Sequence, residues 1–304
     1  MPGRCSGFFI WWDLPTFFNW REMEGDLRWF GKQLDTEFKQ LRIVPISDLH
    51  YGNPLCSIKH FIVTRDFIRD NDDVYTYLNG DLIEAVVLDS AGDIFKQKLT
   101  PQTQRDDVVD LLKPIKDKIL GCVTGNHEDR IYKRVGVDLS EDIANILNVP
   151  YRPEGMLLKV IFGDGNKSTM GKPFVFWGYT THGYGGARTK AAKAVKVERV
   201  GYWIPRADFV TMSHDHVVNV APDVDLIPDN RGYPADNGFI SGKVTAHRKE
   251  LIKTNAYLKW GGYAEMYGFP PTDMATPVIY LLTPKSELWN EIPGRPRNAV
   301  RVIV

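Results

Sequence analysis

Short apolar runs rich in β-branched and aromatic residues alternate with helical stretches through the first two-thirds of the sequence. The runs indicate buried strands, and the stretches between them have the three- and four-residue spacing of amphipathic helices. The strands are expected at residues 41–47, 73–79 and 118–124, and the helices at residues 57–69 and 103–117. Strands that alternate with helices build βαβ units, so the pattern predicts an α/β fold with a largely parallel sheet.

The composition changes after residue 150, where β-type segments predominate. A β-hairpin with the sequence GDGN at its turn is expected over residues 155–180. The other elements expected are a helix over 139–147 with Ser140 as its N-cap, a helix over 187–200 and a strand over 207–213. The tail from residue 217 shows no obvious helix. No low-complexity linker or internal repeat divides the chain, which favours one compact domain.

The first 22 residues differ from the rest because they are rich in Phe and Trp and show little periodicity. Met23 opens a more conventional segment, and we expect an N-terminal leader and helix over residues 1–40 before a single domain over 41–304. One hypothesis is that translation starts at Met23, so that the leader is not native to the working protein. The alternative is that the leader packs as a hydrophobic flap or contacts a partner. The first hypothesis is favoured.

Charge and cysteine content narrow the class of protein. Lys plus Arg and Asp plus Glu both number 38, so no global electrostatic attraction to nucleic acid or to an anionic membrane is expected. The cysteines Cys5, Cys56 and Cys122 form no CxxC pair and leave an odd count, which argues against a disulfide framework. No run approaches the ~18 apolar residues that span a bilayer, so we expect a cytoplasmic protein without a membrane partner.

Polar and ionisable side chains gather where the expected strands end. The first strand leads into the sequence SDLH, the second into NGDLIE and the third into GNHE, and the later segments YTTHG and VTMSHDH supply three more histidines. The side chains concerned are Asp48, His50, Asp81, Glu84, Asn126, His127, His182, His214 and His216. Ligands bind beyond the carboxyl ends of the strands in parallel α/β sheets, so we expect these side chains to form one site.

The residue types of this expected site suit metal ions. Imidazole, carboxylate and amide ligands without thiolates favour divalent ions such as manganese, iron or zinc. Six or seven ligands are too many for one tetrahedral ion and suit two. A carboxylate such as Asp81 can bridge two ions that lie ~3.5–4 Å apart, and such a pair activates water and binds a phosphoryl group. Manganese is the favoured ion, with iron, zinc and nickel as alternatives.

The motifs D-x-H, G-D, G-N-H-E, H and S-H-x-H, in this order, resemble those of the calcineurin-like metallophosphoesterase superfamily. They span residues 48–216, and strand-like flanks extend the resemblance to about 41–283. The segments HGYGGARTKAAK and LKWGGYAEMYGFPP also resemble stand-alone phosphoesterases of phages and bacteria. The resemblance implies an αββα sandwich with a dinuclear metal site at the C-terminal ends of the strands.

The resemblance also implies a role for each residue of the site. Asp48, His50 and His216 would bind one metal, Asn126, His182 and His214 would bind the other, and Asp81 would bridge them. A metal-bound hydroxide would attack phosphorus in line. His127 would protonate the leaving oxygen or stabilise the developing charge, and Glu84 would orient His127 through its carboxylate.

Some positions depart from the family pattern or select among its branches. Ser213 stands where the family more often has Gly, and Glu84 stands where relatives often have Asp. The sequence SHDH resembles the phosphodiesterase and nuclease branches. Ala85 stands where the Ser/Thr phosphatase branch has a phosphate-binding arginine, which counts against a protein phosphatase.

Two arginines are candidates for substrate binding. Arg130 follows the metal loop by one helical turn and could bind a phosphate bidentately, or it could simply pair with a neighbouring carboxylate. Arg188 begins a basic series with Lys190, Lys193 and Lys196 that could follow a phosphodiester backbone. A solvated helix face is the more usual meaning of such a series.

Together these observations predict a metal-dependent phosphoesterase that acts on a phosphodiester, with DNA or RNA among its candidate substrates. The alternatives are a phosphomonoesterase and a non-catalytic scaffold of the same fold that binds partners. A degenerate scaffold is expected to lose ligands or the catalytic histidine, and here every position is filled.

Overall fold

The computed structural model describes residues 25, 27–88, 90, 92–164, 171–235, 238–296 and 298–304. The leader ahead of Met23 therefore lies outside the described residues, as does part of the turn expected in the hairpin at 155–180. Within the described residues, no helix is long and apolar enough to cross a membrane.

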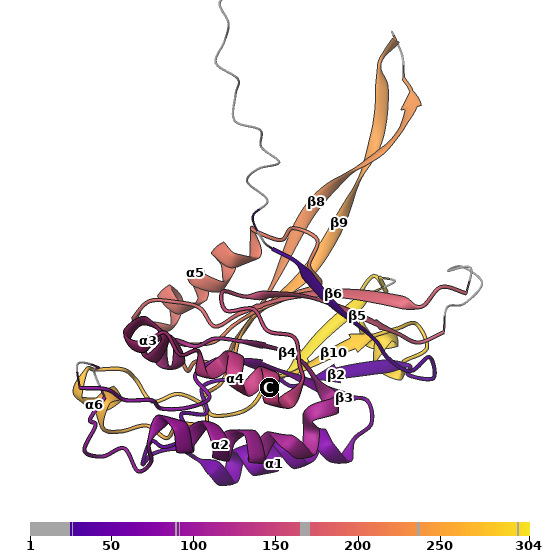
Figure 1. Cartoon of the computed structure of the whole chain (residues 1–304). Coiled ribbons are helices and arrows are strands. Elements are labelled where there is room, and N and C mark those ends of the chain that lie inside the picture. Colours follow the sequence, from indigo (N-terminus) through magenta and orange to yellow (C-terminus); the bar gives the residue numbers. More distant parts are fainter. Residues whose placement is uncertain are drawn as a thin grey trace, which may run out of the picture.

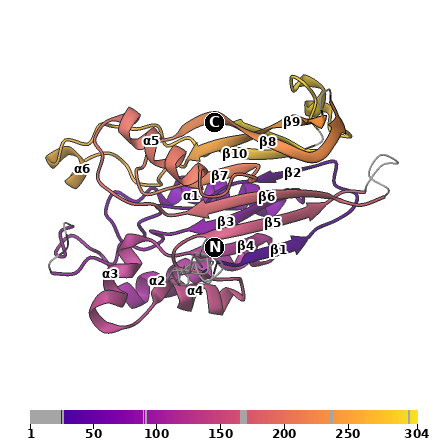
Figure 2. The ribbon, with the colours of Figure 1, turned by 90° about the horizontal axis from the view of Figure 1, so that it is seen from above.

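Two mixed β-sheets form the centre of the molecule (Figure 2). The five-stranded sheet has the order β11 (Ala299–Ile303), β10 (Val278–Leu282), β2 (Gln40–Ile43), β3 (Val74–Asn79) and β4 (Ile119–Val123). The six-stranded sheet has the order β1 (Trp29–Gln33), β5 (Met156–Phe162), β6 (Phe174–Thr181), β7 (Phe209–Met212), β9 (Ile240–Lys253) and β8 (Asn219–Pro234). The three strands expected first in the sequence are confirmed as β2, β3 and β4, which run parallel, whereas β10 joins β2 in the antiparallel direction.

Helices cover the outer faces of both sheets (Figure 1). The helices α1 (Ile58–Asp70), α2 (Pro101–Leu112) and α4 (Leu139–Leu147) pack on the five-stranded sheet, α5 (Lys190–Gly201) packs on the six-stranded sheet, and the 3₁₀ turn η5 (Glu287–Glu291) packs beside β10. Apolar side chains of the two sheets meet between them, where the rings of Phe162 and Phe176 stack with centroids 5.4 Å apart. The expected αββα sandwich is thus confirmed.

Residues 29–33, expected in an N-terminal helix, instead form the strand β1 at the edge of the six-stranded sheet. Exposed and half-buried side chains alternate along β1, as they do in a strand with one covered face. β1 pairs in parallel with β5, and Trp29 packs edge-on against Trp177 of β6 with ring centroids 6.0 Å apart. The prediction of a helix was wrong because this backbone finds its hydrogen-bond partners in the sheet.

Helix ends and the tail also differ from the sequence prediction. Asp138, rather than Ser140, caps α4, because its carboxylate accepts hydrogen bonds from two backbone N–H groups of the first turn. The helix α2 ends earlier than expected and the 3₁₀ turn η2 (Lys113–Lys118) follows, since Pro114 has no N–H to continue an α-helix. The tail contains a one-turn helix, α6 (Tyr263–Met266), where no helix was expected.

The strands β8 and β9 form an antiparallel hairpin that extends past the rest of the sandwich (Figure 1). β7 pairs with β9 only between Glu250 and Lys253, so the earlier residues of β9 have no strand neighbour on that side within the described residues. The part of the hairpin made by residues 224–235 and 238–246 is called the arm below.

Candidate metal centre

The side chains singled out at the strand ends converge at one end of the sandwich. The loops after β2, β3 and β4 supply Asp48, His50, Asp81, Glu84, Asn126 and His127, the last two from the first turn of α3 (Asn126–Val135). The loops after β6 and β7 supply His182, His214 and His216. Among the described residues, three overlapping groups have ligand atoms within 4.8 Å of one another: Asp48–His50–His216, His50–Asp81–His127 and Asp81–His182–His214.

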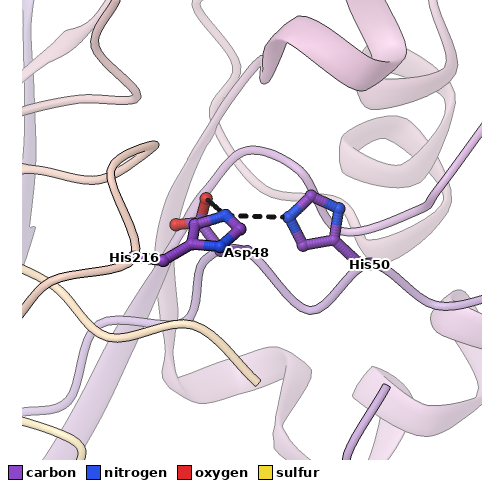
Figure 3. Close-up of side chains that lie close together, drawn as sticks. All are labelled: Asp48, His50 and His216. Atoms are coloured by element: carbon purple, nitrogen blue, oxygen red, sulfur yellow. Dashed lines mark hydrogen bonds and ion pairs between the residues drawn. The ribbon is translucent and has the colours of Figure 1, made fainter. Parts of the chain in front are cut away.

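The first group joins Asp48, His50 and His216 (Figure 3). The Nε2 atom of His216 lies 3.1 Å from Asp48 Oδ1 and 3.1 Å from His50 Nε2. Asp48 Oδ1 is buried and receives no hydrogen bond of good geometry, even though His216 is so close. Two imidazole nitrogens and a carboxylate oxygen therefore point at one small volume, as three ligands of a single ion would.

The group of Asp81, His182 and His214, with Asn126 beside it, is the candidate position of another ion and is called the second group below. Asn126 Oδ1 lies 3.0 Å from His182 Nε2 and 2.7 Å from His214 Nδ1. Asp81 Oδ2 lies 3.2 Å from His182 Nε2 and 3.9 Å from His50 Nε2, which places it between the two groups. This is the position that a bridging carboxylate requires.

The hydrogen bonds around His182 show that a cation fits the second group. Its Nδ1 lies 2.8 Å from the backbone carbonyl of Asn79, which can only accept, so Nδ1 carries the proton. In the neutral ring, Nε2 then carries a lone pair. This lone pair faces the oxygens of the Asp81 carboxylate and the Asn126 amide, which are also acceptors. A divalent ion among them would satisfy all of these lone pairs at once.

Charge compensation in the absence of an ion leads to the same conclusion. Burial is the largest single effect on His182 and lowers its pKa, but the Asp81 and Asp48 carboxylates and the Asn79 carbonyl together outweigh burial and raise this pKa to about 10. Burial is also the largest single effect on Asp48 and raises its pKa, but His216 and His182 together outweigh burial and lower this pKa to about 2. The buried carboxylates thus remain charged and require positive charge beside them, either as protonated imidazole or as metal.

Backbone strain is concentrated at the same residues. Of the eight non-glycine residues with positive φ in the described part of the chain, five are candidate ligands: Asp48 (49°), His50 (50°), Asp81 (51°), His214 (71°) and His216 (54°). Left-handed backbone costs a residue with a Cβ roughly 1–2 kcal/mol. The loops hold these residues in conformations that aim their side chains inward, and such strain is common where a structure preorganises a site.

The contacts of Glu84 and His127 differ from the expectation in one respect. His127 Nδ1 lies 2.7 Å from the backbone carbonyl oxygen of Glu84, whereas its distance to the Glu84 carboxylate is 3.7 Å. That carboxylate instead lies 3.1 Å from His50 Nδ1. Glu84 therefore orients His127 through its main chain and the candidate ligand His50 through its side chain.

Sequence reasoning missed Glu128 as an organiser of the site. Its carboxylate, almost fully buried, accepts hydrogen bonds from the backbone N–H groups of Asp81, Leu82 and Ile83 at 3.1, 2.7 and 3.1 Å. These bonds fix the loop that carries Asp81 against the first turn of α3. In the sequence, only its place directly after His127 pointed to such a role for Glu128. A solvent-exposed carboxylate is also common at the start of a helix, so this position alone did not indicate a buried one.

The sequence reasoning also missed the role of Asp215, which separates the ligand candidates His214 and His216. Its two carboxylate oxygens lie 2.7 Å from Lys196 Nζ and 2.7 Å from Lys253 Nζ, and its carbonyl accepts from Lys193 Nζ at 2.9 Å. Lys193 and Lys196 thus point into the protein and hold the ligand loop. They do not form the solvated basic series that was considered as a path for a phosphodiester backbone.

The two candidate substrate-binding arginines lie in different surroundings. Arg130 is half-buried, and its Nη1 atom is buried without a hydrogen-bond partner. It also lies close enough to His127 to contribute to lowering the pKa of that ring, which burial itself lowers most, to about 4. Arg188 is exposed ahead of α5.

The fold and the cluster define an α/β sandwich protein with groups of candidate metal ligands at its strand ends. No family model matches the chain, and no curated protein matches it. Among solved structures it is similar to a predicted phosphoesterase of Streptococcus pneumoniae, with 13% identity over 80% of this chain and 84% of that chain and a TM-score of 0.34.

Two further solved structures show similarity at the same level. The zinc complex of Vps29 from Entamoeba histolytica has 11% identity over 86% of this chain and 97% of that chain, with a TM-score of 0.33. The nuclease MPE of Pseudomonas putida has 12% identity over 78% of this chain and 82% of that chain, with a TM-score of 0.31.

Proposed function

We propose that the protein is a phosphodiesterase that uses two divalent ions. The observation that carries this proposal is the convergence of two ligand groups on Asp81, which lies within 4 Å of imidazole nitrogens in both. Asp48, His50 and His216 would hold one ion, Asn126, His182 and His214 the other, and Asp81 both. When bound, two such ions activate water and neutralise the equatorial charge of a phosphoryl group. Manganese is proposed, with iron, zinc and nickel as alternatives.

His127 is proposed to supply the proton for the leaving oxygen. The Glu84 carbonyl fixes a proton on Nδ1, so Nε2 is the atom that faces the cluster, 3.8 Å from Asp81 Oδ2. Burial keeps the free ring neutral by lowering its pKa to about 4. An anionic phosphate beside the ring raises this pKa, and Nε2 can then hold the proton that an alkoxide needs to leave.

Arg130 is proposed to bind the substrate phosphate. A buried guanidinium nitrogen without a partner costs free energy, and an oxyanion beside His127 would satisfy it. Arg188 stays a prediction as a second contact, because its exposed position ahead of α5 permits such a contact but does not require it.

An aromatic surface at the rim of the site supports a nucleotide-containing diester as substrate. The rings of Tyr263 and Tyr267 lie 4.4 Å apart, and the ring of Phe269 lies 6.1 Å from that of Tyr263. Lys193 Nζ lies 5.7 Å from the Phe269 ring and also binds the carbonyl of Asp215, so this aromatic rim adjoins the loop of His214 and His216. Both tyrosines are about half exposed, which leaves ring surface for a base to stack on.

The two alternatives are a phosphomonoesterase and a non-catalytic scaffold. All seven candidate ligands and His127 are present and grouped, which argues against a scaffold that has lost its ligands. No contact among the described residues favours a phosphomonoester as substrate.

The test compares the manganese-loaded protein on bis(p-nitrophenyl) phosphate, p-nitrophenyl phosphate and single-stranded DNA. Asp81→Asn is the inactive reference, and Asp110→Asn, an exposed residue paired with Lys113, is the matched control. Cleavage of the diester by the wild type and by Asp110→Asn, but not by Asp81→Asn, is expected. Hydrolysis of the monoester alone would replace the proposal with a phosphomonoesterase. Tight binding of two ions without any hydrolysis would replace it with a scaffold.

A further inference from the structure

The arm has one apolar face that nothing in the described part of the chain covers. Side chains at alternate positions share a face of a strand, and the register pairs Leu226 with Ala246 and Pro228 with Val244. On this face Val224, Leu226, Val244 and Ile240 are 51%, 72%, 60% and 76% exposed. A monomer rarely presents so many adjacent apolar side chains to water without a use for them.

The apolar face continues the interior of the sandwich. At the base of the hairpin Ile252 and Val220 lie on the same face and pack in the core between the two sheets. The five-stranded sheet covers this face only at the base, since its edge strand β11 is the strand that contacts β9. Farther out, the face still carries apolar side chains of the kind found in a core, but the five-stranded sheet does not cover them.

The opposite face and the outer edge of the arm are built for water. On the opposite face the register pairs Asp225 with His247 and Ile227 with Thr245, and Lys243 lies two residues from Thr245, so this face is mainly polar apart from Ile227. The edge strand β8 contains Pro222, Pro228 and Pro234, and each removes a backbone donor from the edge. Edge-to-edge strand addition is therefore disfavoured, and a partner must approach the apolar face itself.

We propose that the arm is a dimerisation device and that its apolar face packs against the same face of a second copy of this chain. At the base of this face, Arg248 and Glu250 pair with each other at 2.7 Å. Among the described residues the face thus presents no unpaired charge, and it is complementary to itself, as a two-fold contact requires. The formal net charge of zero means that two copies do not repel each other.

The size of the contact predicts its strength. An arm ~40 Å long and ~10 Å wide presents about 400 Å² per copy, from the rise and spacing of strands. This is about half of the ~800 Å² per partner in a standard interface. The dimer is therefore expected to be weak and to form at micromolar or higher concentration.

The direction of the arm keeps the candidate metal centre out of this interface. β8 begins three residues after His216 and runs away from it, so its far end lies at the opposite end of the sheet (Figure 1). Arm variants should therefore leave diester hydrolysis per chain unchanged, and the proposal does not depend on the function proposed above.

The test measures the mass of the full chain by light scattering during size exclusion, from low to high micromolar concentration. The wild type is expected to become dimeric with rising concentration, and the double variant Leu226→Asp/Val244→Asp to weaken dimerisation at least about tenfold. Thr245→Asp, one position along the same strand but on the polar face, is the matched control and should dimerise normally. Circular dichroism establishes that each variant is folded.

Oxidative crosslinking checks the geometry independently of any folding defect. Leu226→Cys lies on the apolar face and should form a crosslinked dimer in the wild-type background, whereas Thr245→Cys on the polar face should not. A wild type that stays monomeric at high micromolar concentration would overturn the proposal and leave the apolar face to another segment or partner. A double variant that dimerises as well as the wild type would also overturn it.

Discussion

Replacing Lys253 with Met should cost both fold stability and metal affinity. Lys253 is fully buried at the end of β9; its Nζ atom donates to the Ser213 carbonyl at 2.7 Å and forms an ion pair with the Asp215 carboxylate at 2.7 Å. Breaking a buried pair by removing one partner costs roughly 3–5 kcal/mol. Lys196 still pairs with Asp215 in the variant, so we expect a loss near ~3 kcal/mol. At about 2 °C per kcal/mol this lowers Tm by roughly 6 °C.

Lys249 provides a control in the same strand. It is also fully buried and donates to Asp225 at 2.8 Å and to the Gly201 carbonyl at 2.9 Å, but it lies at the base of the arm. Lys249→Met should therefore lose a similar amount of stability and keep its metal affinity. Lys253→Met should also lose metal affinity by about 10–100-fold, because the loop of His214 and His216 loses one of its supports.

The assay combines thermal denaturation with a manganese titration of the metal-free proteins. Equal metal affinity in the two variants, at equal loss of Tm, would refute the claim that Lys253 acts through the ligand loop. Wild-type stability of Lys253→Met would refute the energetic argument itself.

Three other substitutions test separate contacts. Glu84→Gln weakens the acceptor for His50 and should lower metal affinity about tenfold with little loss of Tm, as measured by calorimetry. Glu128→Ala leaves three buried backbone N–H groups without an acceptor, so urea denaturation should show a loss of at least ~3 kcal/mol, and a loss below 1 kcal/mol would contradict this account. Tyr267→Ala should reduce kcat/KM on single-stranded DNA about tenfold while bis(p-nitrophenyl) phosphate, which has no base, is affected less; an equal loss on both would argue against stacking.

The strand-end residues were predictable because topology alone brings them together. Parallel strands end at one edge of a sheet, so Asp48, Asp81 and Asn126 had to meet once β2, β3 and β4 were recognised. The parts that were not predictable depend on contacts between distant segments. Lys193 has the spacing of a surface helix residue, and only the packing of α5 against the loop of Asp215 turns it inward.

The local sequence pattern also failed to predict secondary structure where pairing with a distant strand decides it. The sequence of residues 29–33 carries no strong strand signal, and its conformation is set by the exposed edge of β5. The strained backbone at Asp48, His50 and Asp81 was equally hidden, because φ follows from the turns of the loops and not from residue type alone. A locally unfavourable backbone conformation at such positions is expected where a protein holds the residues of a functional site in place.

The ligand groups draw on both sheets. In the first, Asp48 and His50 follow a strand of the five-stranded sheet and His216 follows one of the six-stranded sheet; in the second, Asp81 belongs to the former and His182 to the latter. Each ion would therefore cross-link the two halves of the sandwich, as a disulfide does elsewhere. Separation of the two sheets would require release of both ions. Chelation should therefore speed unfolding more than it changes the native structure. Metal exchange should be as slow as the separation of the sheets.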